Sequence, residues 1–182
     1  MAKKMICVTV FLLPLFIILL ILYNLLNYPI LLSLTITAGT FLYHFAMRLS
    51  VGYTIDFILK NKVDYTKKIF QEKKFEKKLY KFLKIDKLKI NAPTFAPENF
   101  DLKTKSLKEV IMATCQAELV HKIIIILSFI PLLFSLFADA FWVFFITSLL
   151  SALYDGLFVA IQRYNRPRLV RILKKTNEIE KE

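Results

Sequence analysis

Four long apolar runs alternate with short turns or polar segments along this chain. They cover Met5 to Leu26, Ile30 to Met47, Ile123 to Phe137 and Phe141 to Ile161. Apolar runs of about 18 residues with almost no charge are typical of helices that cross a bilayer. The pattern therefore predicts four transmembrane helices arranged as two hairpins.

The first run differs from a secretory signal peptide in its length and in the residues after it. A signal peptide has an apolar region of about 7–15 residues and a cleavage site of small residues, and the sequence shows neither. We expect this run to stay in the membrane as a helix. Pro14 and Pro131 lie inside the first and third runs, where proline bends or loosens a transmembrane helix.

Composition supports the same class of protein. Hydrophobic residues make up 57% of the chain and the mean hydropathy is +0.53, whereas soluble domains are about 45–50% apolar. The two cysteines, Cys7 and Cys115, show no C-x-x-C or metal-ligand spacing, so we expect no disulfide and no metal site. The predicted fold class is an all-α integral membrane protein with four transmembrane helices.

The positive charge is unevenly distributed, and this sets the expected orientation. Of the 26 Lys and Arg residues, 15 lie between Tyr53 and Gln116 and seven lie from Arg163 onward, whereas residues 24–29 and 138–140 contain none. Because cytoplasmic loops carry the excess of Lys and Arg, both termini and the long loop are expected on the cytoplasmic side of a bacterial plasma membrane. The net charge of +12 then reflects topology and attraction to anionic lipid headgroups. No recognisable nucleic-acid-binding motif accompanies it.

The long loop between the second and third spans contains a basic segment with helical periodicity. Phe75, Leu79, Phe82 and Leu83 fall on one face of a helix, and lysines cover the rest. Such a cytoplasmic amphipathic helix is suited to lie in the lipid headgroup layer. The alternative is a helix packed on the ends of the bundle with a solvated lysine face, and the sequence leaves both open.

The end of the loop carries a helix-start signal. Ser106 and Glu109, in S-L-K-E, have the spacing of a capping box, and a helix that begins there could continue into the third span. The proline-containing stretch 90–101 before it is expected to be irregular. The predicted organisation has three parts: a transmembrane hairpin (1–52), a basic cytoplasmic loop (53–106), and a second transmembrane hairpin with a basic tail (107–182).

Ionisable residues near the ends of the spans are candidate functional residues, because such groups are costly in a membrane unless they are paired or used. Glu118 and His121 are three residues apart, so their side chains share a helical face. A carboxylate beside an imidazole fixes its tautomer and favours it as a general base. The simpler alternative is a polar pair at the interface or a helix–helix hydrogen bond.

Three arginines lie in the octet QRYNRPRL, directly after the last apolar run. Arg163, Arg166 and Arg168 could hold phosphates or a carboxylate in bidentate fashion. Anchoring by positive charge on the cytoplasmic side is the alternative. Asn165 and Pro167 predict a helix end and a turn within the octet.

A second group of polar residues comes from the spans themselves. His44 and Arg48 share a face near the end of the second span, and Asp155 lies two turns deeper than Gln162 in the fourth. Because Asp155 is too deep to stay unpaired, we expect it to pair with His44, Arg48 or His121.

Two segments are similar to the signatures of a known family. CQAELVH (Cys115 to His121) and QRYNRPRL (Gln162 to Leu169) resemble the two motifs of the glycosyl-4,4'-diaponeurosporenoate acyltransferase family. FEKKLYKFLKIDKLK (Phe75 to Lys89) resembles the segment that precedes them in that family. The resemblance extends over residues 70 to 175, with one departure at Leu88-Lys89, where the family commonly has Trp-Lys.

The resemblance implies that a fatty acyl chain is transferred to a sugar hydroxyl of a glycolipid, such as a carotenoid glycoside in carotenoid biosynthesis. On this interpretation, His121 is the general base on a sugar 6-hydroxyl and Glu118 orients it. The arginines of the octet hold the phosphates of an acyl-CoA or acyl-carrier donor, and Asn165 or Gln162 donates to the oxyanion. A direct transfer requires no metal or redox cofactor. Three further residues are expected to bind substrate: His44, Arg48 and Asp155.

Other functions stay open from the sequence. The protein could be a non-catalytic scaffold or accessory subunit of a lipid-modifying complex, a small carrier with a passage lined by polar residues, or another lipid-active enzyme with a phosphate-bearing donor. Cys115 as an acyl-carrying nucleophile is less favoured, because a lone cysteine in a helix usually packs as a small residue. The expected partners are membrane lipids with anionic headgroups and a lipid or glycolipid acceptor.

Overall fold

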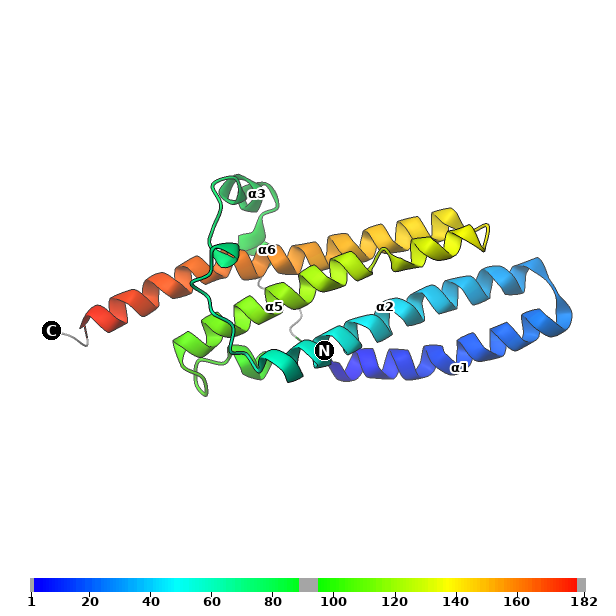
Figure 1. Ribbon diagram of the computed structural model, residues 1–182, viewed down its shortest axis with the longest axis horizontal. Helices are drawn as coiled ribbons and strands as arrows, with labels where there is room; N and C mark the ends of the chain where they lie inside the picture. Colours follow the sequence, from blue (N-terminus) through cyan, green and yellow to red (C-terminus); the bar gives the residue numbers. More distant parts are fainter. Residues whose placement is uncertain (1, 89–94, 180–182) are drawn as a thin grey trace. The chain divides into compact units, whose positions relative to one another are not determined.

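The computed structural model describes residues 2–88 and 95–179, and every regular element in this part of the chain is helical (Figure 1). Part of the stretch 90–101, which was expected to be irregular, lies outside the described residues. Within it, Pro97–Phe100 form a short 3₁₀ helix. In chain order the elements are α1 (Ala2–Leu26), α2 (Pro29–Leu59), η1 (Lys68–Phe70), α3 (Glu76–Phe82), α4 (Ile85–Leu88), η2 (Pro97–Phe100), α5 (Leu107–Leu127), η3 (Ile130–Leu136) and α6 (Phe141–Ile179).

Four helical segments are long and apolar enough to cross a membrane, which confirms the predicted number of spans. They are Ala2–Leu26, Pro29–Leu59, Leu107–Leu136 and Phe141–Thr176. Their outer surfaces are strongly apolar: on α1, for example, Phe11 is 66% exposed. Extended apolar surfaces of this kind mark contact with lipid or with another apolar partner. The protein is therefore a helical membrane protein.

The chain folds into two compact units. Unit 1 comprises Met1–Tyr53 and Ile123–Asp155, and unit 2 comprises Thr54–Lys122 and Gly156–Glu182. The helices α2, α5 and α6 each contribute one part to each unit. Each unit is therefore assembled from segments that are far apart in the sequence.

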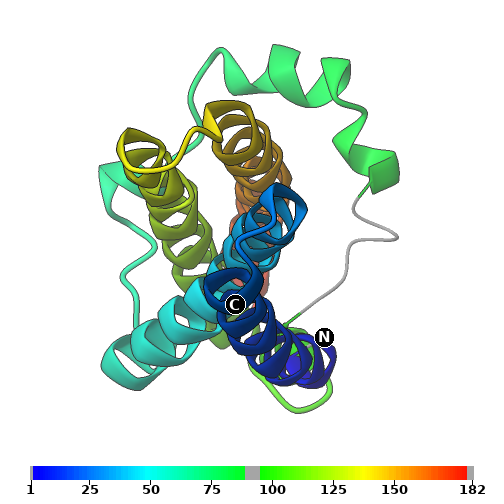
Figure 2. The ribbon, with the colours of Figure 1, turned by 90° about the vertical axis from the view of Figure 1, so that its right-hand side faces the viewer.

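Small and polar side chains line the interior of unit 1. On α2, a Cβ atom added to Gly39 would lie 2.8 Å from the ring of Phe16 on α1, so glycine permits this close approach. The hydroxyls of Ser128 and Ser151 are 2.8 Å apart, and Figure 2 shows η3 beside the first turns of α6. Small residues and hydroxyls are typical of packed transmembrane helices, because they allow close approach and interhelical hydrogen bonds.

Proline acts differently in the first and third spans. Pro14 lies inside α1, which continues to Leu26. By contrast, α5 ends at Leu127, and the span continues as the 3₁₀ helix η3, which contains Pro131. Because proline cannot donate the helical hydrogen bond and its ring crowds the preceding turn, the expected loosening at Pro131 is confirmed.

The predicted capping box at the start of α5 is also confirmed. The Ser106 hydroxyl accepts the Glu109 backbone N–H at 3.3 Å, and the Glu109 carboxylate accepts both the backbone N–H and the hydroxyl of Ser106 at 2.8 Å. These bonds satisfy donors that the first turn of a helix leaves open. The start of this helix is therefore set by local sequence.

The basic segment of the loop forms a shorter helix than its periodicity predicted. Glu76–Phe82 is α-helical, as α3, and Ile85–Leu88 forms the separate short helix α4. Its buried residues are Glu76 and Tyr80, whereas Phe75 and Phe82, from the predicted apolar face, are 62% and 82% exposed. The placement of this segment in the headgroup layer stays a prediction.

The predicted helix end at Asn165 and Pro167 is wrong. The helix α6 runs from Phe141 to Ile179 with Pro167 inside it. Proline removes one helical hydrogen bond and normally costs about 3 kcal/mol or more in a helix interior. Arg163 and Arg166, on the turn before Pro167, make buried ion pairs, and these contacts hold the helical backbone on that side of the proline.

Candidate functional site

Two arginines of α6 and one glutamate of α5 meet inside unit 2. Glu118 is fully buried, and Arg163 and Arg166 are 8% and 2% exposed. Arg163 Nη1 donates to Glu118 Oε1 at 2.7 Å, and Arg166 Nη1 donates to Glu118 Oε2 at 2.6 Å. Each guanidinium group donates to a different carboxylate oxygen. Such charge-assisted hydrogen bonds are strong, and they also fix the orientation of the side chains. The motifs AELVH and QRYNRPRL therefore meet in space.

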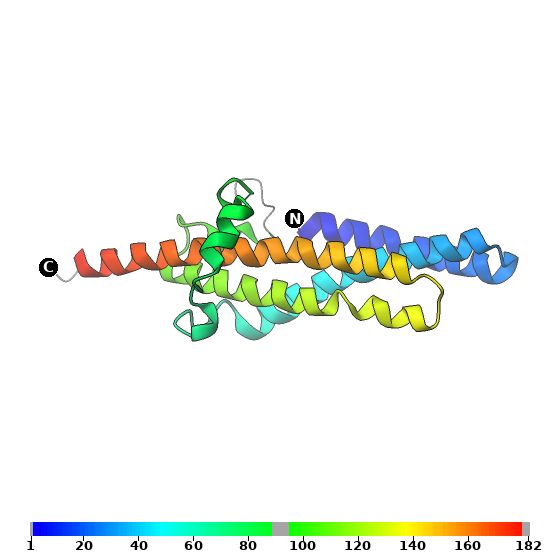
Figure 3. The same cartoon turned by 90° about the horizontal axis from the view of Figure 1, so that it is seen from above.

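Arg163 also binds the basic loop. Its Nε donates to Glu76 Oε1 at 2.8 Å, and its two terminal nitrogens donate to the backbone carbonyls of Ile69 and Gln71 at 2.8 and 2.7 Å. Figure 3 shows the segment that contains α3 lying across α6. The loop is thus tied to α6 by a buried charge pair and by two backbone carbonyls.

Arg166 is held by neutral oxygens in addition to Glu118. It donates to the hydroxyl and the carbonyl of Thr114 at 3.0 and 2.9 Å, and to the Phe70 carbonyl at 3.1 Å. Its guanidinium carbon also lies 5.1 Å from the centre of the Phe70 ring, within the range of a cation–π contact. Both arginines therefore have extensive partners inside the protein.

The charges of this centre balance closely. Glu76 and Glu118 offset Arg163 and Arg166, and Lys122 Nζ donates to Glu118 Oε1 at 2.5 Å from a partly exposed position. Burying charges is costly unless they are paired and hydrogen-bonded. We call these four residues, Glu76, Glu118, Arg163 and Arg166, the ion-pair centre.

Glu76 and Tyr80 were not among the residues singled out from the sequence. The Tyr80 hydroxyl donates to Glu76 Oε2 at 2.8 Å, and its ring packs edge-to-face on Tyr164 with the ring centres 5.5 Å apart. Burial, together with the Glu76 carboxylate, raises the pKa of the Tyr80 hydroxyl above its usual range. One feature of the sequence could have identified them: Glu76 and Tyr80 are one helical turn apart, on a face beside the predicted apolar face of this helix.

His121 lies on α5, one turn beyond Glu118. It is half-buried, and its ring stacks on Phe158 of α6 with the ring centres 4.8 Å apart and the planes 13° from parallel. The hydrogen bonds of the Glu118 carboxylate described above come from Lys122, Arg163 and Arg166. Orientation of His121 by Glu118 stays a prediction.

The other residues of the octet differ in burial. Gln162 and Asn165 are half-buried on α6, and Arg168 is exposed. Arg168 Nη2 donates to the Tyr164 hydroxyl at 2.6 Å, and its guanidinium carbon lies 4.0 Å from the centre of the Tyr164 ring. The structure therefore separates one surface arginine from two buried ones.

Unit 1 contains a second buried ion pair. Asp155 is 1% exposed, and Arg48 Nη2 lies 2.5 Å from its Oδ2 and 2.7 Å from the Ser151 hydroxyl. A partner for Asp155 was expected among His44, Arg48 and His121, and the structure shows Arg48. Near this pair in sequence, the ring nitrogens of buried His44 and the hydroxyl of Ser148 have no hydrogen-bond partner among the described residues.

Cys115 lies in the interior of unit 2. It is fully buried and packs in one apolar cluster with Val63 and Phe70. This environment is typical of a cysteine that acts as a small packing residue. It gives no support to the alternative in which Cys115 carries an acyl group.

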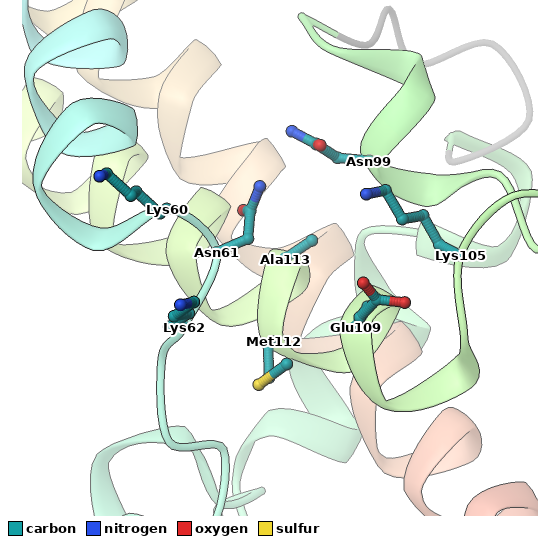
Figure 4. Close-up of a pocket in the computed structure, with 8 residues that line it drawn as sticks. All are labelled: Lys60, Asn61, Lys62, Asn99, Lys105, Glu109, Met112 and Ala113. Carbon is teal, nitrogen blue, oxygen red and sulfur yellow. The ribbon is translucent and has the colours of Figure 1, made fainter.

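Two of the surface pockets lie among the described residues of unit 2. The smaller, about 160 Å³, lies where α2 ends and α5 begins, and Figure 4 shows Asn99 and Lys105 extended toward Asn61 above Glu109. The larger, about 440 Å³, lies between α3 and α6 and is lined partly by Arg168. Glu118 and His121 line neither of these two pockets.

The fold and these sites define an integral membrane protein with four apolar helices and a buried arginine–glutamate centre that joins the third helix, the fourth helix and the basic loop. A family model described as glycosyl-4,4'-diaponeurosporenoate acyltransferase matches residues 66–175. The chain belongs to this family, and the matched region includes the whole ion-pair centre. Comparison with curated proteins and with solved structures gave no match. The family name describes an acyltransferase acting on a glycosylated carotenoid.

Proposed function

We propose that this protein is a membrane acyltransferase that moves a fatty acyl chain onto a hydroxyl of a glycosylated lipid at the cytoplasmic leaflet. The observation that supports the proposal most is the family match over residues 66–175. It includes both motifs, and Glu118 joins them through its two bonds to Arg163 and Arg166. The two motifs are therefore in direct contact through this carboxylate.

In the proposed reaction, His121 acts as the general base. The oxygen of the acceptor hydroxyl attacks the carbonyl carbon of an acyl thioester while His121 takes the hydroxyl proton. Gln162 or Asn165 donates to the oxyanion that develops on the carbonyl oxygen. The carbon–sulfur bond then breaks, and the leaving thiolate takes the proton from His121. Atoms and charges balance without a metal or redox cofactor.

The ion-pair centre has a positioning role in this proposal. Glu118 and His121 are one turn apart on α5, and Arg163 lies between Gln162 and Asn165 on α6. Because Glu118 binds Arg163 at 2.7 Å, the centre sets how far the proposed base lies from the proposed oxyanion donors. Misplacement by about 1 Å can lower a rate about 100-fold, so a rigid clamp at this position serves the chemistry.

The lipid environment of the site is also part of the proposal. Phe75 and Phe82 are exposed on the loop segment that carries many of the lysines. This combination suits insertion into the headgroup layer of an anionic bilayer, from which a lipid acceptor would reach the protein. The polar residues of unit 1, His44, Arg48 and Asp155, are proposed to bind hydroxyl groups of that acceptor.

The test compares the lipids of matched cells that contain the intact protein, the variant His121→Ala or no protein. We expect one lipid species to gain the mass of one fatty acyl chain only with the intact protein. Lys108→Ala serves as the control, because Lys108 is exposed on the same helix and lies outside the proposed chemistry. The intact protein and this control should give the same lipids.

Two results would contradict the proposal. If purified His121→Ala protein transfers the acyl chain at the full rate, His121 is not the base. If no lipid changes although the protein is folded in the membrane, the protein is not an acyltransferase in those cells. The buried ion pairs would then favour a non-catalytic scaffold or accessory subunit of a lipid-modifying complex, because they are also what a rigid structural protein requires.

A further inference from the structure

The larger pocket of unit 2 is lined by cations from two different elements. Its volume is about 440 Å³, and its lining includes Lys77 and Lys81 of α3 and Arg168 and Arg171 of α6. We call this pocket the cationic groove. Pockets that hold ligands are typically about 300–1,000 Å³, so the groove is large enough for a compact polar group.

The arrangement of the four cations follows from helix geometry. Lys77 and Lys81 are four residues apart, and Arg168 and Arg171 are three residues apart. Residues at these spacings share a helical face. Each helix therefore presents two positive charges to the same space.

One of the four cations is held in place before any ligand binds. Arg168 donates to the Tyr164 hydroxyl at 2.6 Å and lies over the Tyr164 ring at 4.0 Å. Tyr164 in turn packs on the buried ring of Tyr80. An arginine that is already ordered loses less entropy when it binds an anion. This order distinguishes the groove from a random set of surface lysines.

The charge of the groove indicates the kind of ligand. Two carboxylates, Glu72 and Asp86, also line it, so four cations and two anions leave a net charge of +2. Glu72 Oε2 lies 4.0 Å from Lys77 Nζ, so one of the two carboxylates offsets part of the charge of α3. A ligand with adjacent phosphates matches two pairs of cations better than a single phosphodiester does.

Two of the three arginines of the octet are already occupied inside the protein. Arg163 and Arg166 donate to carboxylates and carbonyls inside the protein. Every guanidinium nitrogen of both side chains donates to a partner inside the protein. Because both side chains are also buried, they can bind an acyl donor only if the ion-pair centre opens. The groove, in contrast, is open at the surface and contains the remaining arginine of the octet, Arg168.

We propose that the cationic groove binds the diphosphate of a nucleotide thioester of the coenzyme A type. This inference rests on the proposed acyl transfer for its reaction, but the binding itself can be measured without any transfer. A carrier protein offers one phosphodiester at its phosphopantetheine arm, and a phospholipid headgroup offers one phosphate. Both would use the groove's cations only in part.

The experiment measures equilibrium binding of coenzyme A to the full-length protein in nanodiscs of zwitterionic lipid. The test variant is Lys77→Gln/Lys81→Gln. The control is Lys74→Gln/Lys78→Gln, which removes the same number of charges from the same segment at exposed positions that do not line the groove. The four lysines are all exposed, so both variants should fold.

We expect the test variant to weaken coenzyme A binding about tenfold or more, since two charge-assisted contacts are lost. The control should change the dissociation constant by less than about threefold, because screening in water weakens charges outside the groove. Pantetheine, which lacks the phosphates, should not displace coenzyme A from the protein. The adenosine diphosphate part of the molecule alone should compete.

Three results would overturn the proposal. Equal weakening in both variants would mean that net charge, and not the groove, attracts the ligand. Absence of coenzyme A binding by folded protein would exclude the ligand class. The third result comes from a second set of nanodiscs that contain anionic lipid: if that lipid binds in a Lys77- and Lys81-dependent way while coenzyme A does not bind, the groove is a lipid headgroup site.

A parallel transfer assay separates this inference from the proposed function. If acyl transfer from the coenzyme A thioester is unchanged in rate and KM in Lys77→Gln/Lys81→Gln, the groove assignment is wrong and the acyltransferase assignment stands. If coenzyme A binds in the groove but no acyl chain is transferred to any lipid, the groove assignment stands and the proposed reaction is wrong.

Discussion

Replacing Glu118 with alanine is expected to destabilise unit 2 strongly. The carboxylate is fully buried and accepts hydrogen bonds from Lys122, Arg163 and Arg166 at 2.5, 2.7 and 2.6 Å. After the substitution, Arg163 keeps its bond to Glu76. The acceptors left to Arg166 within the described part of the chain are neutral, so its charge becomes uncompensated in the interior.

The expected cost follows from that uncompensated charge. Removing one partner of a buried ion pair costs about 3–5 kcal/mol. At about 2–4 °C per kcal/mol for a chain of this size, the melting temperature should fall by roughly 6–20 °C. The measurement is thermal unfolding of purified protein in detergent, followed by circular dichroism. Glu98→Ala is the matched control, because Glu98 is exposed and should change stability by no more than about 0.5 kcal/mol.

A double-mutant cycle then isolates the contact. Glu118→Ala and Arg166→Ala should each destabilise the protein, and the double variant should cost less than the sum by about 0.5–3 kcal/mol, as for residues in one network. If Glu118→Ala melts at the same temperature as Glu98→Ala, the positioning role is refuted. Loss of acyl transfer with unchanged melting would instead indicate that Glu118 takes part in the chemistry.

Three further predictions concern other buried polar groups. Arg48→Leu should lower the free energy of unfolding by about 3–5 kcal/mol, and adding Asp155→Leu should recover most of this loss. The reason is that a whole buried ion pair can be replaced by apolar residues with little loss of stability. The melting temperatures of the single and double variants test this. His44→Leu should raise stability by about 1–3 kcal/mol, since it removes two buried ring nitrogens without partners among the described residues, and a lower melting temperature would contradict it. The pKa of the Tyr80 hydroxyl is raised from 10.0, so the neutral hydroxyl contributes fully to stability below pH 10. This contribution is lost as the pH rises beyond that value. The difference in melting temperature between the intact protein and Tyr80→Phe should therefore shrink above pH 10.

Local patterns were sufficient for the membrane helices and for the start of α5. An apolar run of bilayer length must form a helix in lipid, because its backbone groups have no other hydrogen-bond partners there. The capping box depends on Ser106 and Glu109, which are three residues apart, so its bonds could be predicted without knowledge of the fold. The same holds for the two family motifs, which are contiguous in the sequence.

The burial of the basic loop could not be predicted in this way. Periodicity places Phe75 and Phe82 together on one side of the helix, and hydrophobicity alone would bury that side. The structure buries Glu76 and Tyr80 instead, because Glu76 binds Arg163, which is 87 residues away in the sequence. A buried charge selects the face that carries its partner, and no local pattern contains that partner.

The three arginines of the octet show where sequence reasoning reaches its limit. By composition Arg163, Arg166 and Arg168 are equivalent, and Pro167 made a helix end the expected outcome. In the continuous helix α6, the first two are three residues apart and face Glu118, while Arg168 lies on another side and stacks on Tyr164. The sequence by itself determined that the chain spans a membrane, which family it resembles and which residue types stand near the ends of the spans. Only the tertiary structure decided which of these charges are paired inside the protein and which stay available to a ligand. The reason is that the cost of desolvating an ion is offset by partners that lie far away in the sequence.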